Sequence, residues 1–208
     1  MRGKIRYRSP AGPGNGFLLA AGFLCLLIVS LPLPAQEYSR GLLAEGTRWE
    51  NPYYVIESGI EGPVVLITGG MHGNEPAGSR AAEQIVHWKI TRGRVVIAPR
   101  TNTPGLKANT RFMPGVEKPA NNLNRNFPAT GAPDQARSVP GKALWELARK
   151  VRPGWVFDLH EGFDFNIANK GSVGSSVIYL ASPETRKVAT LLIDEVNSTI
   201  TDPKRKFV

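Results

Sequence analysis

Short apolar runs rich in β-branched residues alternate along the chain with segments of helical periodicity. The runs predict buried strands because continuous apolar stretches of this length are typical of strands covered on both faces. They lie at residues 63–68, 94–99, 155–159 and 175–180, and a weakly alternating segment at 53–57 predicts an edge strand. Apolar residues at helical spacing predict helices over 79–89, 142–151 and 182–200. The alternation predicts an α/β domain with a largely parallel sheet.

The segment 100–137 breaks this alternation, because it is rich in Asn, Pro and Gly and has little periodicity. A loop region of this length inside a domain is usually functional or disordered. In open α/β sheets, ligands bind at the carboxyl ends of the strands. The polar residues that follow the strands at 63–68, 94–99 and 155–159 are therefore the candidates for a site.

The first 35 residues differ from the rest and resemble a secretory signal. Four basic residues precede a 15-residue apolar run at 17–31, and Ala35 offers a small residue for cleavage before Gln36. The run is shorter than the roughly 20 residues that a membrane span needs. We expect a cleaved signal over 1–35 and a secreted or periplasmic domain over 36–208; an N-terminal membrane anchor is the alternative. Without Cys25, which lies in the apolar run, the mature chain would hold no cysteine and no disulfide.

Composition and charge narrow the class of protein. Of 208 residues, 41% are hydrophobic and 21% charged, which excludes a disordered chain. The formal net charge is +9, but four positive charges lie in the first 35 residues, which leaves +5 over the remaining 173. The other Lys and Arg are scattered, apart from Lys204 to Lys206. Because a nucleic-acid binder would carry clustered bases and a matching motif, we expect no nucleic-acid partner.

Two histidines and a glutamate are placed where strands end. His72 and Glu75 form an H-x-x-E pair in the glycine-rich turn after residues 63–68, and His160 closes 155–159. Two histidines, one carboxylate and a water make a catalytic zinc shell. The alternative is a polar turn and a histidine satisfied by ordinary hydrogen bonds. Asp158 shares a strand face with His160 and is a candidate to support it, whereas His87, placed within the helix at 79–89, is expected to be structural.

The long loop carries two arginines with candidate roles. Arg111 lies in Thr-Arg-Phe at 110–112, and Arg125 follows Asn124 in the run 121–128. An Arg beside an Asn can hold a planar carboxylate through two parallel hydrogen bonds. Taken alone, a single arginine in a surface loop is better explained by solvation.

Together these residues resemble the zinc carboxypeptidase superfamily, in its succinylglutamate desuccinylase and aspartoacylase branch. The resemblance rests on four motifs in order, GGMHGNE at 69–75, TRF at 110–112, NLNRNF at 122–127 and DLHEG at 158–162. It implies a mixed, mainly parallel sheet flanked by helices and one zinc ion held by His72, Glu75 and His160. It also implies that Arg111 stabilises the oxyanion and that Asn124 and Arg125 bind a substrate carboxylate.

Two departures from the family pattern stand out. The family usually has Asp where this chain has Asn122, and an amide keeps the acceptor oxygen but loses the charge that makes a histidine more basic. The general-base glutamate of the family lies well downstream of the last histidine, where Glu184 and Glu195 fall in a predicted helix and Glu161 is expected to point to the opposite face of its strand. We therefore expect the base to be absent and the domain to be truncated at its C-terminus.

The sequence thus predicts a zinc hydrolase that cleaves an amide bond of an N-acyl amino acid or a peptide with a free carboxylate. A zinc-dependent binding module for carboxylate-bearing peptides, weak or inactive in catalysis, is the second interpretation. A metal-free domain with a polar cleft is the third. We expect no stable membrane span once the signal is removed.

Overall fold

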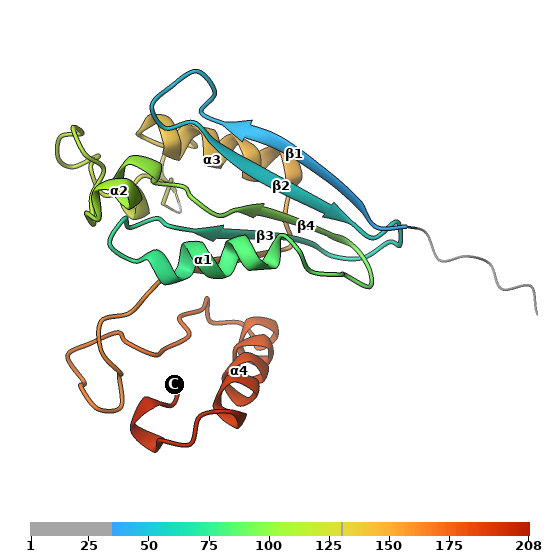
Figure 1. The fold of residues 1–208 in the computed structure, drawn as a ribbon, viewed down its shortest axis with the longest axis vertical. Helices are drawn as coiled ribbons and strands as arrows, with labels where there is room; N and C mark the ends of the chain where they lie inside the picture. The colour runs from blue at the N-terminus through green and yellow to red at the C-terminus, as the bar shows by residue number, and fades with distance from the viewer. Residues whose placement is uncertain (1–34, 130) are drawn as a thin grey trace, which may run out of the picture. The chain divides into compact units, whose positions relative to one another are not determined.

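The computed structural model describes residues 35–129 and 131–208, which belong to one unit of the chain. A five-stranded mixed sheet forms its centre, in the order β1-β2-β4-β3-β5. Figure 1 shows β1, β2, β4 and β3 side by side in this order. β3 (Val64–Gly69) is parallel to both β4 (Arg94–Ala98) and β5 (Trp155–Leu159). β2 (Asn51–Glu57) is antiparallel to β4 and to β1 (Glu37–Leu43). The expected mixed sheet flanked by helices is confirmed.

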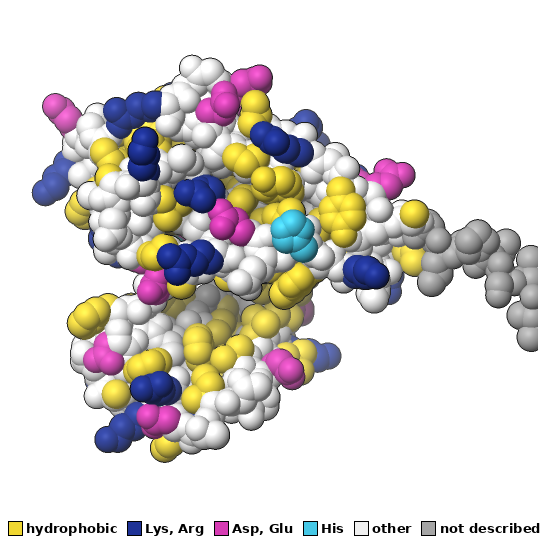
Figure 2. Space-filling model, viewed as in Figure 1, with side chains coloured by type: hydrophobic (Ala, Val, Ile, Leu, Met, Phe, Trp, Pro, Cys, Tyr) yellow, Lys and Arg dark blue, Asp and Glu magenta, His cyan; other side chains and the backbone are white. Residues whose placement is uncertain are grey.

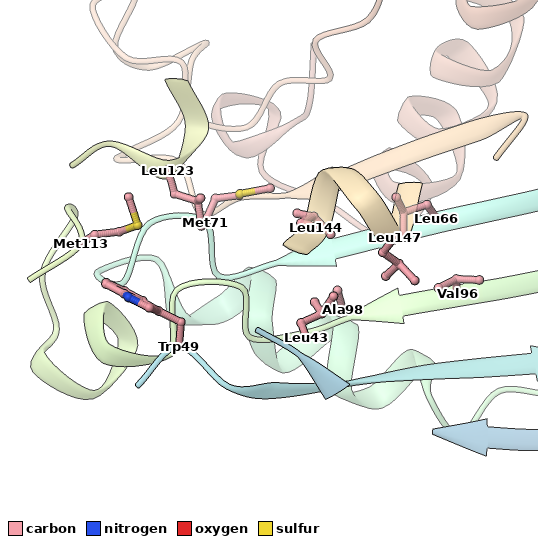
Figure 3. Packing of buried hydrophobic residues seen from close by; sticks show 10 residues of the cluster. All are labelled: Leu43, Trp49, Leu66, Met71, Val96, Ala98, Met113, Leu123, Leu144 and Leu147. Carbon is pink, nitrogen blue, oxygen red and sulfur yellow. The ribbon is translucent and has the colours of Figure 1, made fainter. Parts of the chain in front are cut away.

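Two helices pack on opposite faces of this sheet because successive strand residues point to opposite sides. Leu66 and Val96 belong to a cluster with Leu144 and Leu147 of α3 (Val139–Val151), and Figure 3 shows these side chains meeting between strand and helix. The next residues along the strands, Ile67 and Ile97, pack instead with Ala82 of α1 (Pro76–Ile85). Covering both faces buries the apolar runs that predicted β3 and β4.

Several predicted elements need correction. The segment 53–57 is not at the edge: β2 is internal, and among the described residues β1 and β5 form the edges of the sheet. The residues of β1 are mostly exposed and lack an apolar alternation. α1 runs from Pro76, not from residue 79, because proline fits the first turn of a helix, and it ends before His87. His87 is therefore exposed in a turn and not in a helix.

The predicted strand at 175–180 is also wrong, because that segment has no strand structure. An apolar run forms a strand only where a neighbour accepts its backbone hydrogen bonds. Within the described residues this segment exchanges two such bonds with Val208, from Val177 N (2.9 Å) and to Ser175 O (3.1 Å). One paired residue is too short a ladder for a strand.

The last predicted helix is confirmed as α4 (Pro183–Ser198). Ser182 caps it, since its hydroxyl accepts a hydrogen bond from Thr185 N at 3.2 Å. Its residues are largely exposed, and Figure 2 shows many hydrophobic side chains on the surface of the part of the chain that includes α4. Two short 3-10 helices complete the structure, η1 (Leu123–Arg125) and η2 (Pro203–Arg205).

The loop region 100–137 is irregular as predicted, apart from α2 (Thr103–Ala108) and η1. Asn102 starts α2 by accepting a hydrogen bond from Gly105 N at 3.1 Å. The predicted signal segment lies outside the described residues, so it stays a prediction. In the part of the chain that the structure describes, no helix is both long and apolar enough to cross a membrane.

Candidate metal centre

Three sequence-predicted residues meet at one edge of the sheet. His72 lies in the turn after β3, Glu75 directly precedes α1, and His160 directly follows β5. Their candidate ligand atoms all lie within 4.8 Å of one another. The carboxyl ends of parallel strands therefore bring together residues that are 85 positions apart in sequence, as the motif spacing predicted.

Two glycines allow this approach. Gly70 directly follows β3 and lies in the left-handed region, at φ 71°, which turns the chain sharply toward His72. Gly78 in α1 lies against the end of β5: a Cβ there would come within 2.1 Å of the carbonyl oxygen of Leu159. Because real Cβ atoms do not approach that closely, only glycine lets the first turn of α1 reach the residue before His160.

The Glu75 carboxylate is shared between the two histidines. His72 Nδ1 lies 2.8 Å from Oε1, and His160 Nδ1 lies 2.6 Å from Oε2. Glu75 occupies the position before α1 where a side chain often caps a helix, but its carboxylate makes no capping bond and turns to the histidines instead.

The outer nitrogen of each histidine also faces an oxygen. His72 Nε2 lies 3.2 Å from Asn122 Oδ1, and His160 Nε2 lies 2.8 Å from Asp158 Oδ2. The expected support of His160 by Asp158 and the acceptor role of Asn122 thus have the geometry that they require. In metal centres such partners fix the ring orientation and leave the other nitrogen for the metal.

This arrangement fits a metal ion. A neutral imidazole has one N–H, yet both nitrogens of each ring face oxygen acceptors. Without a cation, each ring must take up a second proton or leave one nitrogen lone pair opposed to an oxygen. A cation between the two Nδ1 atoms and Glu75 removes that conflict, and two imidazoles with one carboxylate are ligands that zinc accepts.

The titration of the metal-free centre reflects the same contacts. Burial acts to raise the pKa of the Glu75 carboxyl, but hydrogen bonds from His160 and His72 and their charges outweigh it and hold the pKa well below its usual range. The hydrogen bond to Asp158 and then the one to Glu75 raise the pKa of His160 to about 9, although burial opposes this. Protons would therefore compete with a divalent cation for the same ligand atoms.

Arg111 forms a contact that sequence reasoning missed. Its Nη1 donates to Glu75 Oε1 at 2.7 Å, so its guanidinium borders the cluster while its side chain is 48% exposed. The predicted role of Arg111 in stabilising an oxyanion requires its guanidinium to lie this close to the cluster. No sequence signal marks the pairing itself, because the two residues lie 36 positions apart.

The second half of the arginine loop is tied to the centre through Asn122. This residue caps η1, where its Oδ1 accepts from Asn124 N at 3.1 Å while it faces His72. Arg125 ends η1 and is exposed, with Nη1 donating to the carbonyl oxygen of Asn124 at 3.1 Å. Asn124 and Arg125 thus lie two and three residues after Asn122, which contacts the cluster.

Glu161 makes a structural contact beside the centre. Its Oε2 accepts a hydrogen bond from Ala77 N, in the first turn of α1, at 2.9 Å. A carboxylate at a helix N-terminus satisfies a free backbone donor and the helix dipole. The expectation that Glu161 is not directed at the metal ligands agrees with this contact.

Comparisons with known proteins agree with the geometry. Residues 61–165 match the family described as the succinylglutamate desuccinylase/aspartoacylase catalytic domain. A curated relative, the N-alpha-acetyl-L-2,4-diaminobutyric acid deacetylase of Halomonas elongata, is 39% identical over 116 residues, which cover 53% of this chain and 32% of the relative. This chain therefore aligns with about a third of that relative's length.

Solved structures show the same fold. An aspartoacylase family protein from Mesorhizobium loti has 26% identity and a TM-score of 0.56, covering 80% of this chain and 52% of that one. The D,L-carboxypeptidase Csd4 of Helicobacter pylori has 20% identity and the same TM-score, covering 70% and 37%. With the family match over half of its length, this chain belongs to the succinylglutamate desuccinylase/aspartoacylase family.

Proposed function

We propose that this protein is a zinc-dependent hydrolase that cleaves the amide bond of an N-acyl amino acid with a free carboxylate. The observation that carries the proposal is the convergence of His72, Glu75 and His160, with an oxygen acceptor behind each histidine. The members of the family named above are hydrolases, a deacetylase among them, which supports the reaction class.

The residues of this chain would divide the work as follows. His72, Glu75 and His160 hold the metal, which when bound polarises a carbonyl oxygen and lowers the pKa of water. Asn122 and Asp158 keep the two imidazoles oriented. Arg111, whose guanidinium borders the cluster, donates to the carbonyl oxygen as negative charge develops there.

The substrate class follows from two sources. The Halomonas relative is named as a deacetylase of an Nα-acetylated amino acid, and it aligns with 53% of this chain. The exposed guanidinium of Arg125, beside Asn124, offers a planar donor for a carboxylate. A peptide with a C-terminal carboxylate would satisfy the same donor, so N-acyl amino acids and peptides are compared directly in the test below.

Three carboxylates beside the centre are already engaged in hydrogen bonds, so we expect this chain to hydrolyse a substrate slowly. Glu75 is bound to both histidines, Asp158 to His160, and Glu161 to the N-terminus of α1. A general base must be free to accept a proton from water, and a positioned base contributes about 10²- to 10⁴-fold in rate. The observation supports a second candidate function, a zinc-dependent module that binds carboxylate-bearing ligands and turns them over poorly.

Metal binding tests the core of the proposal. We expect the reconstituted protein to hold one zinc per chain by elemental analysis, with His72→Ala and His160→Ala each binding far more weakly because the ligand shell becomes incomplete. His87→Ala is the matched control, since His87 is exposed in a turn outside the cluster, and should bind normally. A folded wild-type protein without zinc would refute the proposal.

Ligand binding tests the substrate class. Calorimetry on the zinc-loaded protein should show that an N-acetyl amino acid binds more tightly than its C-terminal amide, and that Arg125→Lys removes most of this difference. Lysine cannot form the two parallel hydrogen bonds of a guanidinium. An equal loss of affinity for the acid and for the amide would show that Arg125 does not bind the carboxylate. Tighter binding of peptides than of N-acetyl amino acids would show that peptides are the substrate class.

A further inference from the structure

A buried hydroxyl lies behind the acid that supports His160. Thr68 of β3 is paired with Asp158 of β5 in the parallel register, and its Oγ1 donates to Asp158 Oδ1 at 2.7 Å. The other oxygen, Oδ2, faces His160 Nε2 at 2.8 Å. Thr68 is 2% exposed. The three side chains form a hydrogen-bonded line from the inside of the sheet to the metal centre.

The hydroxyl is not explained by packing. Thr68 closes the apolar run Val64 to Ile67, where a valine would fill the same space without placing a polar atom in the interior. A buried hydroxyl lowers stability unless it has a partner. Asp158 Oδ1 is that partner, and among the described residues it is Thr68 that donates a hydrogen bond to this oxygen.

The opposite histidine has an equivalent arrangement. Asn122 Oδ1 faces His72 Nε2, and the same side-chain oxygen accepts from the backbone of Asn124 at 3.1 Å, which fixes its direction. Each supporting side chain is therefore itself held by a second donor. On the His72 side that donor is a backbone amide, and on the His160 side it is the hydroxyl of Thr68.

We propose that Thr68 is a positioning residue of the metal centre. By holding Oδ1, it fixes the rotation of the Asp158 carboxylate, so that Oδ2 points at Nε2 and Nδ1 of His160 points toward Glu75. This inference rests on the proposed function in that the oriented histidine serves a metal. The orientation itself exists in the metal-free protein and can be measured there.

The experiment compares three substitutions. Thr68→Val removes the hydroxyl at nearly constant shape, and Thr68→Ser keeps it. Thr101→Val is the matched control, because Thr101 is also 2% exposed and its Oγ1 donates at 3.0 Å to the backbone oxygen of Gly69, with no side chain of the centre involved. If Thr68→Val fails to fold, Thr68→Ala takes its place.

Zinc affinity is the first measurement. The loss of one hydrogen bond behind Asp158 should weaken zinc binding about 3- to 10-fold in Thr68→Val. Thr68→Ser and Thr101→Val should stay within about twofold of the wild type. Equal losses in Thr68→Val and Thr101→Val would assign Thr68 to general stability and overturn the inference.

The second measurement does not depend on zinc. The chain has three histidines, so proton NMR of the metal-free protein can assign the Nε2-bound proton of His160 with the His160→Ala variant. This proton is hydrogen-bonded to Asp158 and should give a downfield signal in the wild type, in Thr68→Ser and in Thr101→Val. In Thr68→Val we expect the signal to be lost through exchange with water.

The two measurements distinguish a failure of the proposed function from a failure of the positioning role of Thr68. If the wild type binds no zinc but the signal is lost in Thr68→Val alone, the proposed function fails and the positioning role stands. If Thr68→Val keeps both the signal and the zinc affinity of the wild type, the positioning role is refuted and the proposed function is untouched.

Discussion

At the scale of single residues, the centre is asymmetric. His160 is supported by the carboxylate of Asp158, and His72 by the uncharged amide of Asn122. A charged acceptor raises the basicity of an imidazole ligand more than an amide does. We therefore expect the two histidines to contribute unequally to holding a cation.

The substitution Asn122→Asp tests this asymmetry. We expect zinc affinity to rise up to about 10-fold, because the new charge stands 3.2 Å from His72 Nε2. Isothermal titration with a competing chelator measures the change. Asn121→Asp adds the same charge one residue away and is the control; an equal gain there would mean that net charge alone attracts the metal.

The pH dependence of stability follows from His160 and Glu75 in the metal-free protein. His160, with a pKa raised from 6.5 to about 9, contributes stability that is complete below pH 6.5 and is lost as the pH rises through 9. Glu75, with a lowered pKa, contributes stability above pH 4.5 that is lost as the pH falls further. Their joint contribution is greatest between pH 4.5 and 6.5.

Denaturant unfolding at several pH values measures this effect. Between pH 6.5 and 9 the folded state binds one proton more than the unfolded state at His160, so stability falls by up to about 1.4 kcal/mol per pH unit. Asp158→Asn removes the main cause of the shift and should flatten this slope, whereas Asp134→Asn, at an exposed site, should not. An unchanged slope in Asp158→Asn would contradict the assignment.

At the scale of elements, the centre depends on how closely α1 approaches β5. The contact of Gly78 with the carbonyl of Leu159 sets the distance between Glu75 at the start of α1 and His160 at the end of β5. The metal ligands are therefore positioned by backbone packing as well as by their own hydrogen bonds.

Gly78→Ala should disrupt this packing. The added Cβ would lie 2.1 Å from a backbone oxygen, so the helix must move, and we expect a loss of about 1–3 kcal/mol in stability together with weaker zinc binding. Chemical denaturation and zinc titration measure the two effects. Gly154→Ala, where the nearest atom would be 3.9 Å away, is the control and should be nearly neutral.

At the scale of the whole molecule, the exposed apolar side chains of the described residues concentrate in the last 46 positions of the chain. Phe163, Ile178 and Leu180 are each more than 80% exposed. Apolar surface of this kind is rare on a protein that stays monomeric.

We expect the 208-residue chain to self-associate as its concentration rises, which analytical ultracentrifugation measures. A charged residue at the surface, as in Ile178→Lys or Leu180→Lys, should lower the association. Trp88→Lys changes an exposed aromatic residue elsewhere and should have little effect. If all three variants associate like the wild type, another surface is responsible.

The sequence predicted the parallel strands of the sheet better than it predicted β1 and the segment 175–180. β3 and β4 are marked by β-branched runs that the sheet buries on both faces, whereas β5 is a short apolar run that stays partly exposed. The motif order placed His72, Glu75 and His160 together. β1 escaped detection because an exposed edge strand needs no apolar pattern. The run at 175–180 has the pattern without the partner strand, which only tertiary structure can supply.

The contacts behind the metal ligands could be predicted only in part. Asp158 precedes His160 by two residues, so the alternation of a strand places both on one face. Thr68 and Arg111 reach the centre from 90 and 36 positions away, through strand register and loop path. Such pairings depend on tertiary geometry that no local pattern encodes.

The start of α1 lies directly beside the centre. Glu75 precedes its first turn, and Glu161, next to His160, accepts a hydrogen bond from Ala77 N. Metal binding at the centre and local unfolding of α1 are therefore thermodynamically linked. A ligand that binds only when α1 is folded opposes the local unfolding of this helix. At a zinc concentration 100 times the dissociation constant, opening of α1 becomes about 100-fold rarer. We therefore expect the backbone amides of α1 to exchange with deuterium more slowly in the zinc-loaded protein than in the zinc-free protein, so that hydrogen exchange of the helix reports metal binding.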